Sequence, residues 1–221
     1  MRLLFLLVLG IISISACTKQ PAFTTLSDLT YPNTEGSAEP HWAFTVEGSL
    51  IMLQASGVQL AIIGHSERRQ LFGETDAGVN TKPRATLAAG LTPIVCVGET
   101  LAERESGHTF GVLDRQIGDG LAQLTPAQGT ELVVAYEPVW AIGSGRTPTV
   151  EDVQAMHAHM RATVSASHGT YFADQVRLLY GGSVKPGNAS ELMGLTDVDG
   201  ALVGGASLVA GDFLAIAGHC S

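Results

Sequence analysis

From residue 46 onward, short apolar runs rich in β-branched residues alternate with longer segments of helical period. Short apolar runs bounded by glycine and polar residues are typical of buried strands, and the longer segments predict helices. We predict five strands, at residues 59–65, 92–98, 131–137, 176–182 and 200–205. We predict helices at residues 47–57, 82–90, 110–124, 150–169 and 188–195. This alternation predicts an α/β fold in which five βα units build one parallel sheet.

The first 17 residues follow a different pattern. Arg2 is the only charged residue, an apolar run follows, and Ala16-Cys17 ends the stretch. This order is typical of a secretory signal, and the ending resembles a bacterial lipoprotein cleavage box in which Cys17 would be lipidated. A buried strand or helix of the core, or a stretch created by a wrong start, are the alternatives. Residues 18–42 have no period and many turn formers, which predicts a linker or an irregular segment.

Polar residues and glycines follow the predicted strands where each strand ends. His65 closes the first strand, and Glu137 closes the third. Gly181-Gly182-Ser183 ends the fourth strand, and Gly204-Gly205 ends the fifth. Because ligands bind at the carboxyl ends of parallel strands, we expect one site assembled from these turns.

Two of these residues suit proton transfer next to a carbonyl group. Glu137 stands at the mouth of an apolar site, where partial desolvation disfavours its charge and makes it a candidate base. His65 precedes the helix start Ser66-Glu67, whose positive end would lower the pKa of the imidazole and keep it neutral as a hydrogen-bond donor. The alternatives are a helix or surface carboxylate for Glu137 and a satisfied core histidine for His65.

The glycine turns suit an anion. They allow a ligand to approach the backbone closely, and Gly204-Gly205 would open a short helix whose free N–H groups point at a phosphate. Residues 138–147 combine proline, small residues and Trp140, which suits a lid with Gly143 donating its N–H to the phosphate. Ordinary turns and an ordinary strand-to-helix connection are the alternatives.

Several motifs occur in an order that resembles the triosephosphate isomerases. They are Ala43-Phe44-Thr45 and the strings IGHSERR (63–69), VCVGETLAERESG (95–107), AYEPVWAIGSGRT (135–147), YGGS (180–183) and LVGGAS (202–207). The resemblance covers residues 43–217 and implies a TIM-barrel type (β/α)8 fold for residues 43–221, incomplete, with strands four to eight present.

The resemblance also implies a reaction and a site. The reaction is the interconversion of dihydroxyacetone phosphate and glyceraldehyde 3-phosphate through an enediol, in glycolysis and gluconeogenesis. Pairing of a glutamate base with a neutral histidine, and a lid that gates the site, are known from this family. The implied catalytic residues are His65, Glu137 and, close by, Glu67, and the implied phosphate-binding residues are Gly143, Ser183, Gly204 and Gly205. No metal or organic cofactor is implied, and the implied partners are a phosphorylated triose and a second copy in a cytoplasmic homodimer.

The sequence departs from the family at its N-terminal side. The family uses an Asn-x-Lys at the end of its first barrel strand, whereas the lysines here are Lys19, Lys82 and Lys185. Asn80-Thr81-Lys82 fits the letters but falls in a predicted helix, and Lys185 follows the fourth strand's turn toward solvent. Only 58 residues precede Gln59, too few for three further units of about 30 residues. We therefore expect an isomerase of impaired turnover, or else a catalytically inactive protein that binds a phosphate or a partner.

The net charge and the cysteine content limit the classes of binding partner that the sequence predicts. Twelve Lys and Arg face 21 Asp and Glu, for a formal net charge of -9, which argues against nucleic-acid binding. Cys17, Cys96 and Cys220 lack metal spacing and support no disulfide framework. Cys96 lies in an apolar run and is expected in the core, and a membrane is an expected partner only if Cys17 is lipidated, as in an exported lipoprotein.

Overall fold

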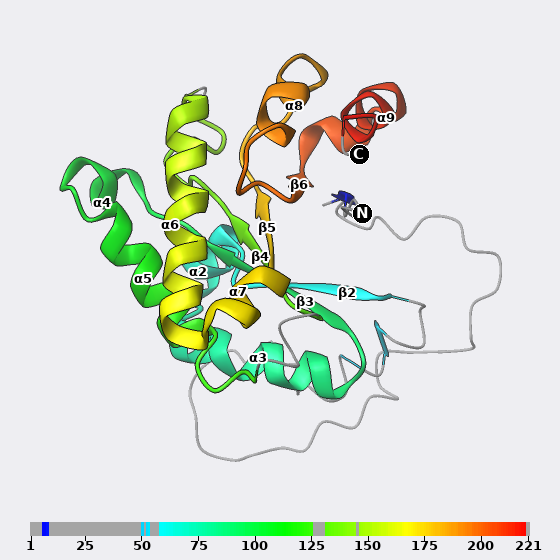
Figure 1. Cartoon of the computed structure of the whole chain (residues 1–221). Helices are drawn as coiled ribbons and strands as arrows, with labels where there is room; N and C mark the ends of the chain where they lie inside the picture. The colour runs from blue at the N-terminus through cyan, green and yellow to red at the C-terminus, as the bar shows by residue number, and fades with distance from the viewer. Residues whose placement is uncertain are drawn as a thin grey trace.

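A computed structural model describes residues 6–8, 50, 52–53, 58–125, 131–144 and 146–219 of the 221-residue chain. Its strands form one six-stranded sheet in the order β1-β6-β5-β4-β3-β2, with every pairing parallel (Figure 1). The strands are β1 (Leu6–Val8), β2 (Leu60–Ile63), β3 (Thr92–Val97), β4 (Val133–Tyr136), β5 (Arg177–Tyr180) and β6 (Gly200–Val203). The five predicted strands are thereby confirmed, each ending before its glycine or polar turn.

Helices follow the strands. They are α2 (Ser66–Phe72), α3 (Asp76–Ala88), α4 (Leu101–Glu105), α5 (Thr109–Gly120), α6 (Val150–His168), α7 (Thr170–Gln175), α8 (Pro186–Met193), the 3-10 helix η3 (Gly205–Leu208) and α9 (Ala210–Ala217). Of the helix predicted at residues 47–57, Leu50, Met52 and Leu53 are described, and they are helical.

One helix start was predicted wrongly. We expected a helix from Lys82, with Pro83 in its first turn, but α3 begins at Asp76. Thr75 caps it, because its hydroxyl accepts a hydrogen bond from the Gly78 N–H at 3.2 Å. Pro83 therefore lies inside the helix, and the cap upstream decides where the helix begins.

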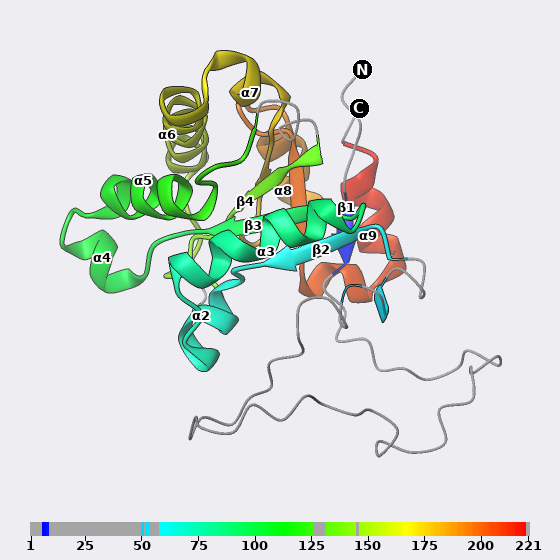
Figure 2. The same ribbon diagram turned by 90° about the horizontal axis from the view of Figure 1, so that it is seen from below.

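The sheet curls like part of a barrel, with helices α3, α5 and α6 along its outer face (Figures 1 and 2). Alternate residues of β3 belong to two different hydrophobic clusters, because successive side chains of a strand point to opposite faces of the sheet. Val95 and Val97 join the large cluster between sheet and helices, while Ile94 and Cys96 join a smaller cluster on the other face. Cys96 is buried and free, as expected. With β1 and β2 as its two edges, the sheet is that of an incomplete TIM-type barrel.

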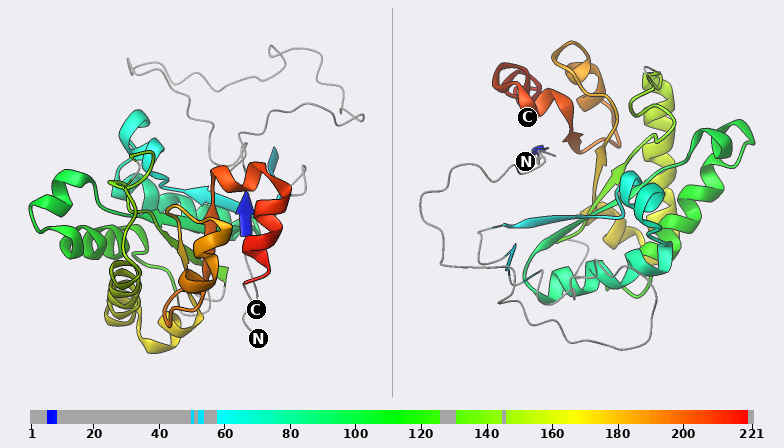
Figure 3. Two further views of the ribbon diagram at one scale, coloured as in Figure 1. Left: turned by 90° about the horizontal axis from the view of Figure 1, so that it is seen from above. Right: turned by 180° about the vertical axis from the view of Figure 1, so that it is seen from behind.

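Three residues of the predicted leader form an edge strand. Leu6, Leu7 and Val8 of β1 pair in parallel with Ala201, Leu202 and Val203 of β6 (Figure 3). An apolar run suits such a strand as well as it suits a signal, so the strand of the alternative interpretation is present at these three residues. Export remains a prediction, because Cys17, Cys220 and the linker at residues 18–42 lie outside the described residues. None of the described helices is long and apolar enough to cross a membrane.

Candidate active site

His65 and Glu137 meet at the carboxyl ends of β2 and β4. Glu137 follows β4 directly and is 2% exposed. Its Oε1 lies 2.8 Å from Nε2 of His65, and its Oε2 accepts a hydrogen bond from the backbone N–H of Ser66 at 2.9 Å. Both oxygens of this buried carboxylate therefore have a partner, which burial of a charge requires.

His65 is the N-cap of α2, and its two ring nitrogens have different partners. Nδ1 accepts the backbone N–H of Glu67 at 3.4 Å, while Nε2 faces Glu137. We expected the helix end to lower the pKa of His65, and this was wrong. The hydrogen bond with Glu137 raises the pKa of His65 and outweighs the opposing effect of burial. A tertiary ion pair thus overrides the local effect of the helix N-terminus.

Glu67 lies next to this pair in the first turn of α2. Its backbone N–H donates to Nδ1 of His65, the N-cap residue, and its own side chain is exposed. Its charge contributes to the raised pKa of His65, after the two contributions of Glu137. The structure therefore connects Glu67 to the histidine mainly through the backbone.

Gly98 allows β3 and β4 to end close together. A Cβ at Gly98 would overlap the carbonyl oxygen of Glu137, so only glycine fits. The Gln116 side chain holds the same residue, accepting from Gly98 N at 2.7 Å and donating to Gly98 O at 3.2 Å. The sequence analysis did not identify Ser66, Gly98 or Gln116 as site residues. For Gly98 a signal was available, because this glycine directly follows an apolar run.

Cys96 lies on the inner face of β3 near Glu137. Burial, and then the charge of Glu137, raise the pKa of the Cys96 thiol well above its ordinary value. A neutral buried thiol is a weak nucleophile. Cys96 is therefore a buried neighbour of Glu137 and is not a candidate nucleophile.

Three of the predicted phosphate-binding residues, Ser183, Gly204 and Gly205, lie beyond β5 and β6, and they are exposed. Ser183 follows the turn after β5, and its carbonyl accepts from the Asn188 side chain at 3.0 Å. Gly204 and Gly205 are exposed where β6 gives way to η3. They follow the same ends of parallel strands as His65 and Glu137, so all belong to one mouth of the sheet.

Gly143 lies on the predicted lid, of which all residues from 138 to 147 except Gly145 are described. It adopts a positive φ of 67° and is exposed. Ile142 beside it is 43% exposed. The tip of this segment therefore faces solvent in the structure.

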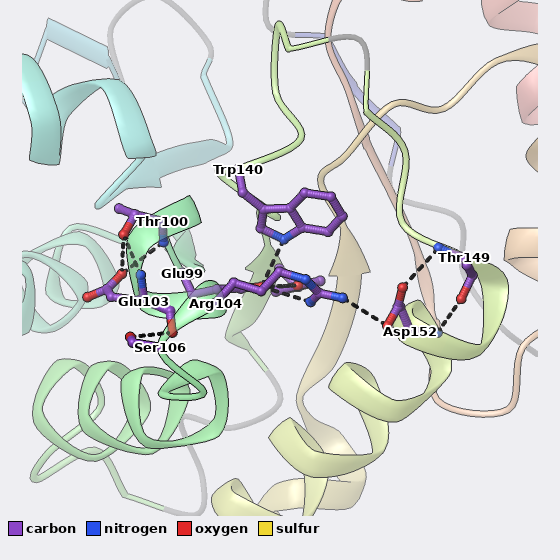
Figure 4. A network of polar contacts seen from close by, with 9 residues as sticks. Glu99, Thr100, Glu103, Arg104, Ser106, Trp140, Thr149 and Asp152 are labelled. Carbon is purple, nitrogen blue, oxygen red and sulfur yellow. Dashed lines mark hydrogen bonds and ion pairs between the residues drawn. The ribbon is translucent and has the colours of Figure 1, made fainter.

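A buried carboxylate holds the beginning of the lid (Figure 4). Glu99 is 0% exposed and accepts hydrogen bonds from Trp140 Nε1 at 2.9 Å and from the Tyr136 hydroxyl at 3.1 Å. Arg104 lies 3.3 Å from it. Burial raises the pKa of Glu99, and burial with the charge of Glu99 raises the pKa of Tyr136. These residues belong to two of the motifs, at residues 95–107 and 135–147, and of them the sequence analysis assigned only Trp140, to the lid.

Neither of the two lysines within the described ranges is bonded to His65 or Glu137. Lys82 lies in α3 and forms an ion pair with Glu74. Asn80, in the same helix, donates to the carbonyls of Gly120 and Ala122, so this triplet is structural, as expected. Lys185 is exposed, and Lys19 is outside the described residues. The described part also contains no group of three or more His, Cys, Asp or Glu residues that could hold a metal ion.

Comparison with known proteins agrees with this architecture. The family model of triosephosphate isomerase matches residues 11–220. A triosephosphate isomerase of Endomicrobium trichonymphae is 54% identical over 175 residues, which cover 79% of this chain and 70% of that protein. Those of Moorella thermoacetica and Chloroflexus aurantiacus are 55% and 53% identical, over 82% and 84% of this chain and 72% of each protein. The chain belongs to the triosephosphate isomerase family.

Proposed function

We propose that this chain interconverts dihydroxyacetone phosphate and glyceraldehyde 3-phosphate. The observation that carries the proposal is the 2.8 Å contact between the buried Glu137 and the partly buried His65 at the carboxyl ends of parallel strands. Family membership favours this activity over an inactive phosphate- or partner-binding role.

In this proposal, Glu137 moves a proton between adjacent carbon atoms of the substrate. A positioned carboxylate contributes typically 10²–10⁴-fold to such a step. The Nδ1 atom of His65 accepts a backbone N–H, so the neutral ring carries its proton on Nε2. His65 Nε2–H then polarises the substrate carbonyl and shuttles hydroxyl protons. Substrate entering between the two side chains replaces their mutual contact.

The phosphate would be held by backbone groups of Gly143, Ser183, Gly204 and Gly205, and Glu67 would contribute next to His65. Backbone N–H groups at such turns bind phosphate without a basic side chain. The lid would exclude water from the reactive enediol. Acid–base catalysis of this kind uses only side chains and backbone, so we assign no metal or organic cofactor.

We expect turnover below that of a family member with the Asn-x-Lys. Removing one group aimed at the charge of the transition state costs about 100- to 1000-fold in rate. An assay coupled to a dehydrogenase, run with the purified chain and such a relative, measures this difference. Equal rates would contradict it.

Glu137→Gln tests the assignment of the base. We expect a further loss of at least about 100-fold, with binding of glycerol 3-phosphate retained, because backbone donors and not this carboxylate hold the phosphate. Glu191→Gln, an exposed change on α8, is the matched control and should leave the rate unchanged. A Glu137→Gln protein as active as the parent would refute the proposed mechanism.

We further propose that the active form is a homodimer. Leu71 and Phe72, at the end of α2, are 72% and 65% exposed. Other residues of the same helix, Ser66, Arg69 and Gln70, line a hollow of about 420 Å³. A second copy covering this face would bury both side chains. Light scattering with size exclusion tests this, and a Leu71→Lys variant should shift the mass toward the monomer.

We propose a cytoplasmic location, as the family relationship favours. The alternative is an exported lipoprotein anchored at Cys17. Membrane fractionation of the parent and of Cys17→Ala, with mass measurement of the N-terminus, distinguishes them. A protein that is membrane-bound only when Cys17 is present would refute the cytoplasmic assignment.

A further inference from the structure

Arg104 of α4 contacts Trp140 within the lid segment at residues 138–147 and Asp152 in the helix that follows this segment (Figure 4). Its guanidinium carbon lies 4.4 Å from the centre of the Trp140 ring, and its Nη1 lies 3.3 Å from Glu99. Its Nη2 lies 3.0 Å from Oδ1 of Asp152. Trp140 is the third residue of the lid, and Asp152 follows the lid in the first turn of α6. One side chain therefore links the two points where this segment leaves and rejoins the body of the protein.

The groups that Arg104 contacts are fixed by bonds of their own. Glu99 is fully buried and also accepts from Tyr136 and Trp140. Asp152 uses its other oxygen, Oδ2, to accept the Thr149 N–H at 3.2 Å, and its own N–H donates to the Thr149 hydroxyl at 3.1 Å. Arg104 thus lies between two anchored carboxylates.

The middle of the lid contrasts with its ends. Ile142 and Gly143 are exposed, whereas Trp140 donates to the Glu99 carboxylate and has the Arg104 guanidinium over its ring. A segment with fixed ends and an exposed tip can move only through the few residues between the anchors. The geometry of the anchors then limits where the Gly143 N–H can go.

We propose that Arg104 is a positioning residue for the lid, which fixes the relative placement of its two ends and thereby the approach of Gly143 to the substrate phosphate. The role of Gly143 rests on the proposed function, whereas the link between the two ends does not. Only a planar guanidinium can stack on an indole and also reach two carboxylates with separate nitrogens. A lysine at this position could keep one of these contacts.

If Arg104 positions Trp140 through Glu99, replacing Arg104 should change how the environment of Trp140 depends on pH. An arginine that only stabilises the fold would not have this effect. The charged and titratable groups facing Glu99 are Arg104 and Tyr136, with Trp140 as a third donor. Without Arg104, Glu99 would be a buried carboxylate with no cation beside it, and it would take up a proton at higher pH. A protonated Glu99 accepts the Trp140 N–H less strongly, so the environment of Trp140 would change with pH.

The experiment labels Trp140 with 5-fluorotryptophan in a Trp42→Phe background and follows its ¹⁹F resonance. Arg104→Met and Arg104→Lys are compared with Arg161→Met, which removes an arginine bound to Asp197 and Asp199 at 3.1 and 2.6 Å, away from the lid. Spectra are recorded across pH, with and without glycerol 3-phosphate, and melting temperatures are measured for each variant.

We expect Arg104→Met to shift and broaden the ligand-free resonance and to move its titration to higher pH. Affinity for glycerol 3-phosphate should fall about tenfold, because ordering the lid then costs more on binding. Arg104→Lys should give an intermediate result, and Arg161→Met should lower the melting temperature without moving the resonance.

The proposal is overturned if Arg104→Met keeps the resonance, its pH profile and the affinity of the parent, or if Arg161→Met changes them equally. The ligand-free resonance needs no turnover, so it tests the link even if the chain proves inactive. Loss of isomerase activity in the parent would refute the proposed function alone.

Discussion

The mouth of the sheet has two regions that are built differently. Around Glu137, the ends of β2, β3 and β4 are tightly joined, and both carboxylate oxygens are bonded within the protein. Around Ser183, Gly204 and Gly205, the ends of β5 and β6 present exposed backbone. The region proposed for proton transfer is therefore held by contacts within the fold, whereas the region proposed for phosphate binding has exposed backbone.

Physical chemistry explains the difference. A buried charge needs its partners in place, since an unpaired one costs several kcal/mol. Exposed backbone groups remain hydrated until an anion replaces the water. Substitutions should consequently damage stability in the first region and binding in the second.

The largest effect is expected from Gly98→Ala. Its new methyl group would overlap the carbonyl oxygen of Glu137, which is backbone and cannot give way cheaply. We expect a loss of at least about 3 kcal/mol in the free energy of unfolding, measured by urea denaturation. Gly111→Ala, where a Cβ meets nothing within 4 Å, is the matched control, and equal stability of the two variants would contradict the close contact.

A smaller loss is expected from Ser66→Pro. Ser66 is the first residue of α2, where proline is tolerated, and His65 has φ of -51° and ψ of 143°, which suits a residue before proline. The change therefore removes chiefly the N–H that Glu137 accepts. A lost hydrogen bond to a charged group predicts about 1.5–3 kcal/mol less stability. Ser66→Ala keeps the N–H, so a Ser66→Pro protein no less stable than Ser66→Ala would show that this bond contributes little.

A structural feature can be predicted from the sequence when the residues that cause it are neighbours in the chain, and it is missed when they are far apart. The strands β2 to β6 follow from apolar runs, and His65 and Glu137 follow from motifs at their ends. The pKa of His65 was predicted in the wrong direction because its cause is Glu137, a residue far along the chain. Likewise, the apolar pattern at Leu6–Val8 suits a signal and a strand equally; the pairing with β6 shows a strand at these residues, and export stays a prediction.

Two histidines should give opposite pH dependences of stability. The pKa of His65 is raised by Glu137, so its stabilising contribution is complete below its ordinary value of 6.5 and is lost as pH rises through the folded-state value. Burial lowers the pKa of His157, which is 0% exposed on α6, so its contribution is complete above 6.5 and is lost as pH falls.

We would test these opposite pH dependences by measuring the free energy of unfolding from pH 5 to 9, about the range in which histidine titrates. The proteins compared are the parent, His65→Gln and His157→Met. The difference between the parent and His65→Gln should shrink as pH rises. The parent should lose stability relative to His157→Met as pH falls. Parallel curves for all three proteins would show that neither contact changes the titration.

The smallest effect on stability is expected from Gly205→Ala in the phosphate region. A Cβ there meets no heavy atom within 4 Å, so the free energy of unfolding should change by no more than about 0.5 kcal/mol. The methyl group would nevertheless occupy the space in which a phosphate approaches the backbone, and affinity for glycerol 3-phosphate should fall several-fold. Gly187→Ala, an exposed change on α8 with equally open space, should leave this affinity unchanged in calorimetric titration. If Gly205→Ala lost stability but kept its affinity, the two regions of the mouth would not differ in the way proposed, because the phosphate region would then also be organised by internal contacts.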